Sequence, residues 1–186
     1  MTIMGFILMS NGKLVYTIGY DFRSFGEFLD ILKFYRVKQV IDIRRWVKSR
    51  RIPDYSYENL SRQLPLHGIA YTWLPELGGY RRFGVDVEDY GIATCFESQG
   101  FRAYATYITM KKEVKPYLDK LVELVSKKTS TLMCREKLPW KCHRKILADY
   151  LLAKGFQVIH IIDKNRVYKH KLHKCAEIVN GELRYR

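Results

Sequence analysis

The sequence predicts one α/β domain over residues 1–186, with three layers: a mostly parallel central sheet, helices on both of its faces, and a C-terminal hairpin. Two observations predict this class. Short apolar runs typical of buried strands alternate along the chain with segments whose apolar residues recur every three or four positions, as in helices. A chain of 186 residues that is 47% hydrophobic can also bury a core without help from disulfides or metal ions.

The first predicted strand, residues 14–18, is an apolar run that contains β-branched side chains. Ser24 followed by Glu27 is a capping-box pattern, which predicts that a helix begins there. Residues 37–43 form the second predicted strand, which ends in Asp42-Ile43-Arg44. This strand, helix, strand order favours parallel pairing, because the helix carries the chain back to the starting end of the sheet.

The next segment predicts a second helix and a third strand. Ser56 can cap a short helix that ends at Leu64, and residues 69–73 return as a strand. Residues 78–100 follow without clear periodicity, and an insert of this length is typical of a lid, a binding loop or disorder. Two helical stretches then lead to the fourth strand.

The fourth predicted strand is the buried run at residues 129–133, and the chain turns helical from Cys142. Gly155 suits the C′ position that ends this helix, since glycine adopts a left-handed backbone readily. Residues 157–162 form the fifth predicted strand, and Asn180-Gly181 predicts a hairpin turn near the C-terminus.

The loop between the fourth strand and the helix after it carries the densest group of reactive side chains. Open α/β sheets bind ligands at the carboxyl ends of their strands, and a helix N-terminus favours an anion such as a phosphate or a thiolate. Cys134 or Cys142 is therefore predicted to be a reactive thiol. Glu136 is its predicted acid, base or orienting partner, while His143 and Arg144 are predicted to bind an anion and the transition state. The alternative is that Cys134 is a small core residue and the charges form a solvated loop.

Further candidate substrate-binding residues lie at or just after the ends of other predicted strands. They are Gly19, Tyr20, Asp42, Arg44 and Glu76. Because parallel strands end at one edge of a sheet, we expect one cavity there to be lined by most of the set Gly19, Asp42, Arg44, Glu76, Cys134, Glu136 and His143. Two alternatives stay open: Gly19 as an ordinary turn glycine, and Asp42 with Arg44 as a structural ion pair. His160 lies within an apolar strand and is interpreted as a hydrogen-bonded core residue.

No metal site and no other cofactor is predicted. Cys134, Cys142 and His143 could supply three ligands, but their spacing lacks the usual Cys pair separated by two to four residues, and an adjacent Cys and His seldom point at one ion. A tyrosine-phosphatase-like loop would need Arg six positions after the cysteine, and Trp140 stands six positions after Cys134.

The charge of the chain points to an anionic partner. Lys and Arg number 33 against 19 Asp and Glu, a net charge of +14, and part of the excess lies between Arg44 and Arg51 with Trp46 among the cations. This mixture can hold phosphates and stack bases, so nucleic acid or a nucleotide is the predicted partner and Arg50 and Arg51 are candidate substrate-binding residues. A generic solvated basic surface is the alternative. No RRM, KH or helix-turn-helix signature is evident.

The remaining features predict a cytoplasmic protein without a membrane span. The four cysteines lack a regular spacing and are read as thiols of a reducing compartment. Residues 1–9 are apolar but lack a basic start and a cleavage site, which favours a frayed or edge strand over a signal peptide. No run reaches the roughly 18 apolar residues of a membrane span.

The same loop resembles a family signature. Cys134, Glu136, Pro139 and Cys142-His143-Arg144 match the C-x-E-x-x-P-x-x-C-H-R pattern of the domain of unknown function 488 family. The other matching stretches run in order from about residue 15 to the C-terminus. They are Tyr16-Thr17-Ile18-Gly19-Tyr20 with Arg23-Ser24, Ile41-Asp42-Ile43-Arg44, Ser49-Arg50-Arg51, Leu74-Pro75-Glu76-Leu77-Gly78-Gly79, Phe101-Arg102-Ala103-Tyr104-Ala105, and Val158-Ile159-His160-Ile161 with His170.

Two positions depart from the family pattern. Tyr20 stands where many relatives carry His, and Arg135 stands where a small residue is common. The resemblance implies a compact α/β domain and carries no settled reaction.

From the loop and the charge, we expect an enzyme that acts on a phosphate-bearing substrate, a nucleotide or nucleic acid, by hydrolysis or transfer that depends on a thiol. One alternative is a non-catalytic nucleic-acid-binding module in which the loop clamps phosphate. Another is rhodanese-like sulfur transfer on Cys134, since the strand end at Ile41-Asp42-Ile43-Arg44 resembles rhodaneses, although their short Cys-centred loop is not evident. The substrate, the reaction and the oligomeric state are not specified by these residues.

Overall fold

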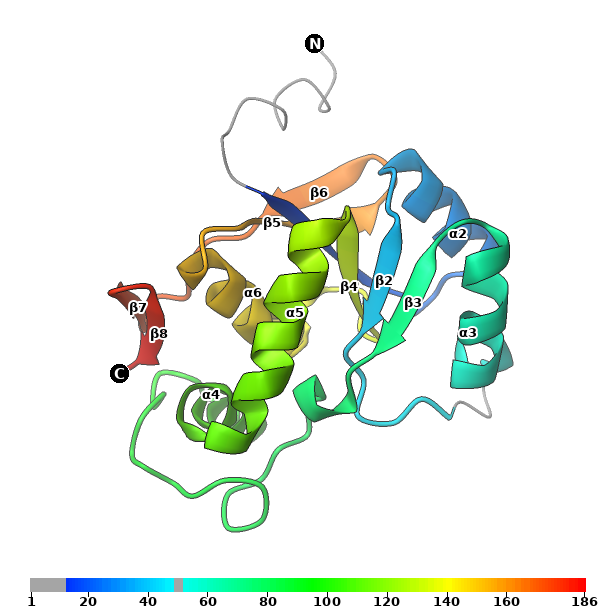
Figure 1. Ribbon diagram of the computed structural model, residues 1–186. Helices are drawn as coiled ribbons and strands as arrows, with labels where there is room; N and C mark the ends of the chain where they lie inside the picture. The colour runs from blue at the N-terminus through cyan, green and yellow to red at the C-terminus, as the bar shows by residue number, and fades with distance from the viewer. Residues whose placement is uncertain (1–12, 49–51) are drawn as a thin grey trace.

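The computed structural model describes residues 13–48 and 52–186, and it has the predicted three-layer α/β architecture (Figure 1). The edge strand predicted at residues 1–9 lies outside the described residues, as do Arg50 and Arg51. The central sheet has the strand order β3-β2-β4-β1-β5-β6. Its strands are β1 (Leu14–Gly19), β2 (Gln39–Asp42), β3 (Ala70–Trp73), β4 (Ser130–Cys134), β5 (Gln157–Asp163) and β6 (Arg166–Lys169).

The first five strands of the sheet pair in parallel, as the alternation of strands and helices predicts. All five lie within one or two residues of the predicted bounds at each end. β6 pairs antiparallel with β5 and was not predicted, because its residues are mostly polar and exposed and carry little strand pattern. β6 therefore adds an antiparallel edge to an otherwise parallel sheet.

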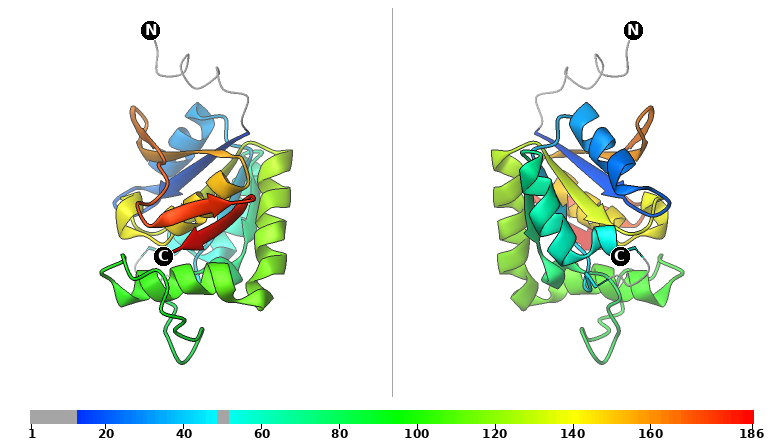
Figure 2. Two further views of the ribbon diagram at one scale, coloured as in Figure 1. Left: turned by 90° about the vertical axis from the view of Figure 1, so that its left-hand side faces the viewer. Right: turned by 90° about the vertical axis from the view of Figure 1, so that its right-hand side faces the viewer.

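Helices cover both faces of the sheet, as Figures 1 and 2 show. The first face packs on α2 (Phe25–Phe34) and α3 (Tyr57–Leu66). The second packs on α4 (Gln99–Met110), α5 (Lys115–Lys127) and α6 (Arg144–Ala153). Because side chains alternate along a strand, neighbouring residues enter different cores, and strands covered on both sides read as continuous apolar runs.

The local start and stop patterns are confirmed at three helices. Ser24 and Glu27 make the full capping box of α2, and the Ser56 side chain accepts from the N–H of Asn59 at the start of α3. Gly155 follows α6 with φ +82°, the left-handed backbone expected after a helix. The start of α6 itself was predicted two residues too early, because a short 3₁₀ turn, Pro139–Lys141, leaves Cys142 extended.

Residues 78–98 form irregular chain between a 3₁₀ turn, Pro75–Leu77, and α4, and the last two residues of the predicted insert are helical. Beyond the main sheet, β7 (Ala176–Val179) and β8 (Glu182–Tyr185) form the predicted C-terminal hairpin. Asn180 and Gly181 connect them with φ values of 52° and 76°, as an Asn-Gly turn requires.

The sequence predicts four thiols, and this is wrong for one pair: Cys95 and Cys175 form a disulfide with a Cα–Cα distance of 6.2 Å. Cys134 and Cys142 are free and buried. The bond joins the irregular segment before α4 to the chain before β7 across 80 residues, a contact that spacing alone does not indicate. Among the described residues, no helix combines the length and the apolar character needed to cross a membrane.

Candidate active site

The predicted site loop leaves β4, which lies between β2 and β1 in the sheet. The chain first builds outward from β1 to β2 and β3, then returns to insert β4 and crosses to β5 on the far side of β1. The loop therefore lies at the carboxyl ends of strands where the order of the sheet reverses: the chain runs to one side of β1 to form β2 and to the other side of β1 to form β5. This is the usual position of ligands in open α/β sheets. A cavity of about 450 Å³ lies there.

Five of the predicted site residues line this cavity, and they come from three different strand ends. They are Tyr20, Arg44, Cys134, Glu136 and His143. Seven further residues that the sequence does not single out as site residues also line it. These are Arg45, Trp46, Lys48, Ile52, Gly79, Tyr80 and Arg135. The signal for most of them is the basic, aromatic segment after β2, which the sequence marks as a charged surface without assigning it to this cavity.

Two sulfurs and one imidazole meet at the cavity, and we call Cys134, Cys142 and His143 the Cys-Cys-His cluster. The Nδ1 atom of His143 lies 3.8 Å from Cys134 Sγ and 3.7 Å from Cys142 Sγ. Its Nε2 atom lies 3.0 Å from the carbonyl oxygen of Ile43, to which it can donate. The expectation that Cys142 and His143 point apart is therefore wrong: the backbone changes from extended at Cys142 to helical at His143, which turns both side chains to one place.

The groups of the cluster shift one another's pKa values. Burial alone would raise the pKa of Cys142, but the hydrogen bond with Cys134 and the positive charges of His143 and Arg144 hold it well below its usual range. The hydrogen bond with Cys142 and burial raise the pKa of Cys134. Burial opposes the charge of His143, yet the adjacent Cys142 raises its pKa. Of the two thiols, Cys142 is therefore the more acidic.

Glu136 is the carboxylate of the cavity. Its Oε2 atom accepts from Cys134 Sγ at 3.2 Å. Burial and the nearby Cys142 raise the pKa of Glu136. A carboxylate in this environment can take up the thiol proton, which is the role of a general base.

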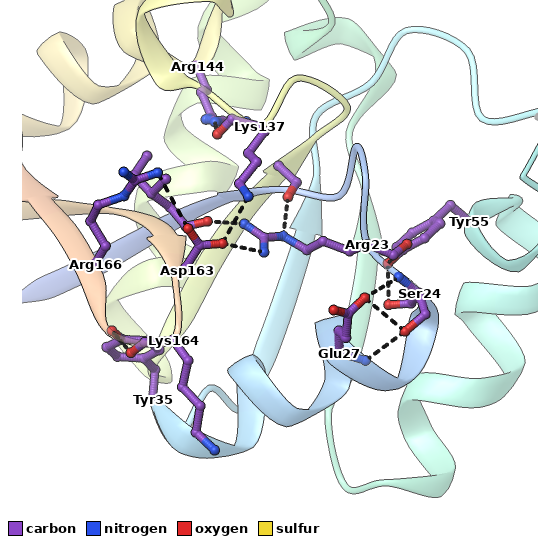
Figure 3. A network of polar contacts seen from close by, with 12 residues as sticks. Arg23, Ser24, Glu27, Tyr35, Tyr55, Lys137, Arg144, Asp163, Lys164 and Arg166 are labelled. Atoms are coloured by element: carbon purple, nitrogen blue, oxygen red, sulfur yellow. Dashed lines mark hydrogen bonds and ion pairs between the residues drawn. The ribbon is translucent and has the colours of Figure 1, made fainter.

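The predicted anion binder Arg144 does not line the cavity. It is fully buried, and its guanidinium donates to the carbonyl oxygens of Glu136 and Lys137. Figure 3 shows how the same loop is held from its other side: Lys137 pairs with Asp163 at 3.0 Å, and Arg23 pairs with Asp163 at 3.2 Å. Arg144 therefore positions the loop that presents Glu136.

Asp42 and Arg44 form the buried ion pair that was one of the two interpretations of these residues. Arg44 donates from Nε to Asp42 Oδ1 at 2.9 Å and from Nη2 to Oδ2 at 2.6 Å. Tyr71 donates its hydroxyl to the same carboxylate at 2.7 Å. Arg44 also donates from Nη1 to the hydroxyl of Tyr20 at 3.1 Å. The ring of Tyr20 stacks on the ring of Tyr55. Asp42 therefore orients the guanidinium of Arg44. Of these two residues, Arg44 lines the cavity and Asp42 does not.

Two glycines permit close approaches around the site. A Cβ atom on Gly19 would lie 1.9 Å from the carbonyl oxygen of Glu136, and one on Gly79 would lie 2.8 Å from His143 Nδ1. Glu76 does not line the cavity: its backbone carbonyl accepts from Arg81 and Tyr107. Gly19 is therefore a contact point for the loop, and the predicted role of Glu76 at the cavity is not supported by its position.

Replacing Gly19 with Ala is expected to destabilise the domain by about 1–3 kcal/mol, because the new methyl group meets backbone atoms of the loop and forces them to shift. Urea unfolding measures this change. The matched control is Gly26→Ala in α2, where the nearest atom would lie 3.9 Å away and where Ala favours the helix, so stability should stay level or rise. Equal losses in both variants would contradict a close contact at Gly19.

A family model described as a domain of unknown function, DUF488, matches residues 24–151. The matched range includes the whole Cys-Cys-His cluster, Glu136 and the Asp42–Arg44 pair, while Gly19 and Tyr20 precede it. The searches of curated proteins and of solved structures found no match.

Proposed function

We propose, from the premise that this chain belongs to the DUF488 family of unknown function, that it is an enzyme acting on a phosphate-bearing substrate, a nucleotide or nucleic acid. Cys134 is its proposed reactive thiol. One observation carries the proposal: two buried sulfurs and an imidazole lie together at a cavity that is lined by cationic side chains.

The cations support an anionic substrate. Arg44, Arg45, Lys48 and Arg135 line the cavity against one carboxylate, Glu136, among its described lining residues. Arg44 is held in place by Asp42, and Arg45 is held by a 2.9 Å ion pair to Asp86, so both guanidinium groups are oriented before a ligand arrives. Guanidinium groups bind phosphate oxygens with paired hydrogen bonds, which favours a phosphate over a neutral ligand.

Two exposed aromatic rings support a base next to the phosphate. Trp46 is 63% exposed and Tyr80 is 71% exposed, and their ring centroids lie 5.7 Å apart beside the cavity. The guanidinium of Arg45 lies over Trp46, 5.2 Å from the ring centroid. Exposed rings among cations form the usual stacking surface for nucleotide bases.

The chemical roles follow from position. Cys134 lines the cavity and Cys142, which is buried, does not, so Cys134 Sγ is the proposed nucleophile. Glu136, 3.2 Å from that sulfur, is proposed to take its proton. The imidazole of His143, 3.8 Å from Cys134 Sγ, is proposed to stabilise the resulting thiolate. The proposed setting is the cytoplasm, on the ground that Cys134 and Cys142 are free thiols. The Cys95–Cys175 disulfide is an observation against it, since disulfides are rare in that compartment.

The experiment is iodoacetamide labelling near neutral pH, with a chelator present and each labelled cysteine identified by mass spectrometry. Cys134 should label much faster than a thiol in an unstructured peptide, because it lines the cavity and Glu136, 3.2 Å from its sulfur, is placed to take up its proton. Adenosine monophosphate should slow that labelling, and adenosine, which lacks the phosphate, should slow it much less. Lys48→Ala should weaken the protection without changing the labelling rate of the unliganded protein.

Equal and slow labelling of Cys134 and Cys142, with no effect of the nucleotide, would refute the thiol enzyme. If labelling is slow but an oligonucleotide still binds with a steep dependence on salt, a non-catalytic nucleic-acid-binding module becomes the better assignment. The exposed rings of Trp46 and Tyr80 and the cations that line the cavity favour that second function, because nucleic-acid binding by these residues does not require the sulfurs.

A further inference from the structure

We propose that the Cys-Cys-His cluster is also a binding site for one thiophilic divalent cation of the Zn²⁺ class. The inference rests on the proposed function in one respect, that Cys134 is the reactive sulfur. A bound cation would use the electron pair with which Cys134 attacks a substrate, so metal binding would switch off the thiol reversibly.

The spacing of the three donor atoms fits one tetrahedral ion. Both sulfur to Nδ1 distances, 3.8 and 3.7 Å, are close to the roughly 3.6 Å that Zn–S bonds of about 2.3 Å and Zn–N bonds of about 2.0–2.1 Å produce at a tetrahedral angle. All three donor atoms lie within 4.8 Å of one another. An ion placed between them would need only small movements of the side chains.

The orientation of His143 gives an independent reason. Its Nε2 atom is directed at the carbonyl oxygen of Ile43, 3.0 Å away, and a proton there leaves the lone pair of Nδ1 facing the two sulfurs. Metal-binding histidines commonly donate the other ring N–H to a carbonyl or carboxylate in this way, which holds the ring for coordination. Gly79 leaves room for the ring, since a Cβ there would lie 2.8 Å from Nδ1.

Charge balance also fits a buried ion. Cys142 and His143 are 1% and 8% exposed, so a net charge on the cluster would be costly. Two thiolates, one neutral imidazole and one divalent cation sum to zero. The fourth coordination position would open on the cavity, because Cys134, His143 and Glu136 all line it.

A second group of potential ligands provides the control. Cys95, His173 and Cys175 also lie close together, but their two sulfurs are joined in a disulfide and are therefore not thiolate donors. A variant that replaces both Cys95 and Cys175 with Ser removes this group and leaves the Cys-Cys-His cluster intact.

The test uses the full chain, freed of metal with a chelator and titrated with Zn²⁺ and with Co²⁺. Wild type and the Cys95→Ser, Cys175→Ser double variant should each bind one ion and show sulfur to cobalt charge-transfer bands. Cys134→Ser and Cys142→Ser should each lose more than the roughly 10–100-fold in affinity that loss of an outer hydrogen-bond partner costs. Zn²⁺ should also protect Cys134 and Cys142 of the wild type from iodoacetamide. This measurement does not depend on the folding of any variant.

The outcomes separate this proposal from the previous one. If Zn²⁺ neither binds nor protects, while Cys134 labels fast and the nucleotide slows it, the metal site is refuted and the thiol enzyme stands. If one ion binds through these residues but Cys134 of the metal-free protein labels no faster than a peptide thiol, the metal site stands and the thiol enzyme fails. Cobalt bands that disappear only in the Cys95→Ser, Cys175→Ser variant would also refute the proposed ligands.

Discussion

Replacing Asp42 with Ala is expected to destabilise the domain by about 3–5 kcal/mol, because it leaves the guanidinium of Arg44 buried without its carboxylate. Asp42 is fully buried and the Arg44 side chain is 6% exposed. The carboxylate accepts three hydrogen bonds from that guanidinium, one from the backbone N–H of Arg44 and one from the hydroxyl of Tyr71. Urea or thermal unfolding followed by circular dichroism measures the loss.

The controls separate the charge from the hydrogen bonds. Tyr71→Phe removes one hydrogen bond and leaves the ion pair, so it should cost only about 1 kcal/mol. The double variant Asp42→Ala, Arg44→Met removes both charges and should be more stable than Asp42→Ala alone. A cost below 1 kcal/mol for Asp42→Ala, or a double variant no more stable than the single one, would contradict this expectation. It would mean that water solvates the guanidinium of Arg44 once Asp42 is removed.

The second large effect is a loss of stability in acid that comes from His160. Burial lowers the pKa of His160 to about 3, and the charges of His170 and Arg144 act in the same direction. Nδ1 of its ring lies 2.7 Å from the hydroxyl of Thr17, and Nε2 lies 2.9 Å from His170, which in turn contacts Asp149 at 2.8 Å. Protonation would place a charge in this buried row of hydrogen bonds.

The direction of the effect follows from the two pKa values. Between about pH 6.5, where histidine titrates in the unfolded chain, and about pH 3, the unfolded chain holds a proton on His160 that the folded protein does not. Stability is therefore complete above this window and falls as the pH falls through it. From about pH 7.5 to pH 5, the wild type should lose about 2 kcal/mol more than His160→Gln, which cannot titrate.

The variant His67→Gln is the matched control for the acid effect, because His67 is exposed at the C-terminal end of α3. It should retain the wild-type dependence of unfolding free energy on pH. Parallel curves for His160→Gln and the wild type would mean that the folded protein protonates His160 as easily as the unfolded chain does.

Most of the fold could be predicted from the sequence, because the patterns that specify it are local. Ser24 and Glu27 are three residues apart and cap one helix, and Asn180-Gly181 makes its turn within four residues. The apolar runs of β1 to β5 could be recognised as strands because a strand that is buried on both faces of a sheet has a continuous apolar sequence. β6 was missed because an edge strand of mostly exposed residues lacks such a run.

The candidate site could be located from the sequence in part. Cys134 and Glu136 lie at the end of β4, and the rule that parallel strands end together places them beside Tyr20 and Arg44. The same rule does not say which side chains turn into the cavity. Glu76 follows a strand end as well, yet it does not line the cavity.

By itself the sequence determined the α/β class, the mostly parallel pairing of the strands and the loop that carries the reactive residues, since each follows from local patterns and their alternation along the chain. Only the tertiary structure decided that Arg144 supports the loop from behind, that Gly19 touches the carbonyl of Glu136, and that Cys142 and His143 face one point with Cys134. The physical reason is that the direction of a side chain depends on the packing around it. Here that packing joins β1, β2 and β4, which lie far apart in the chain.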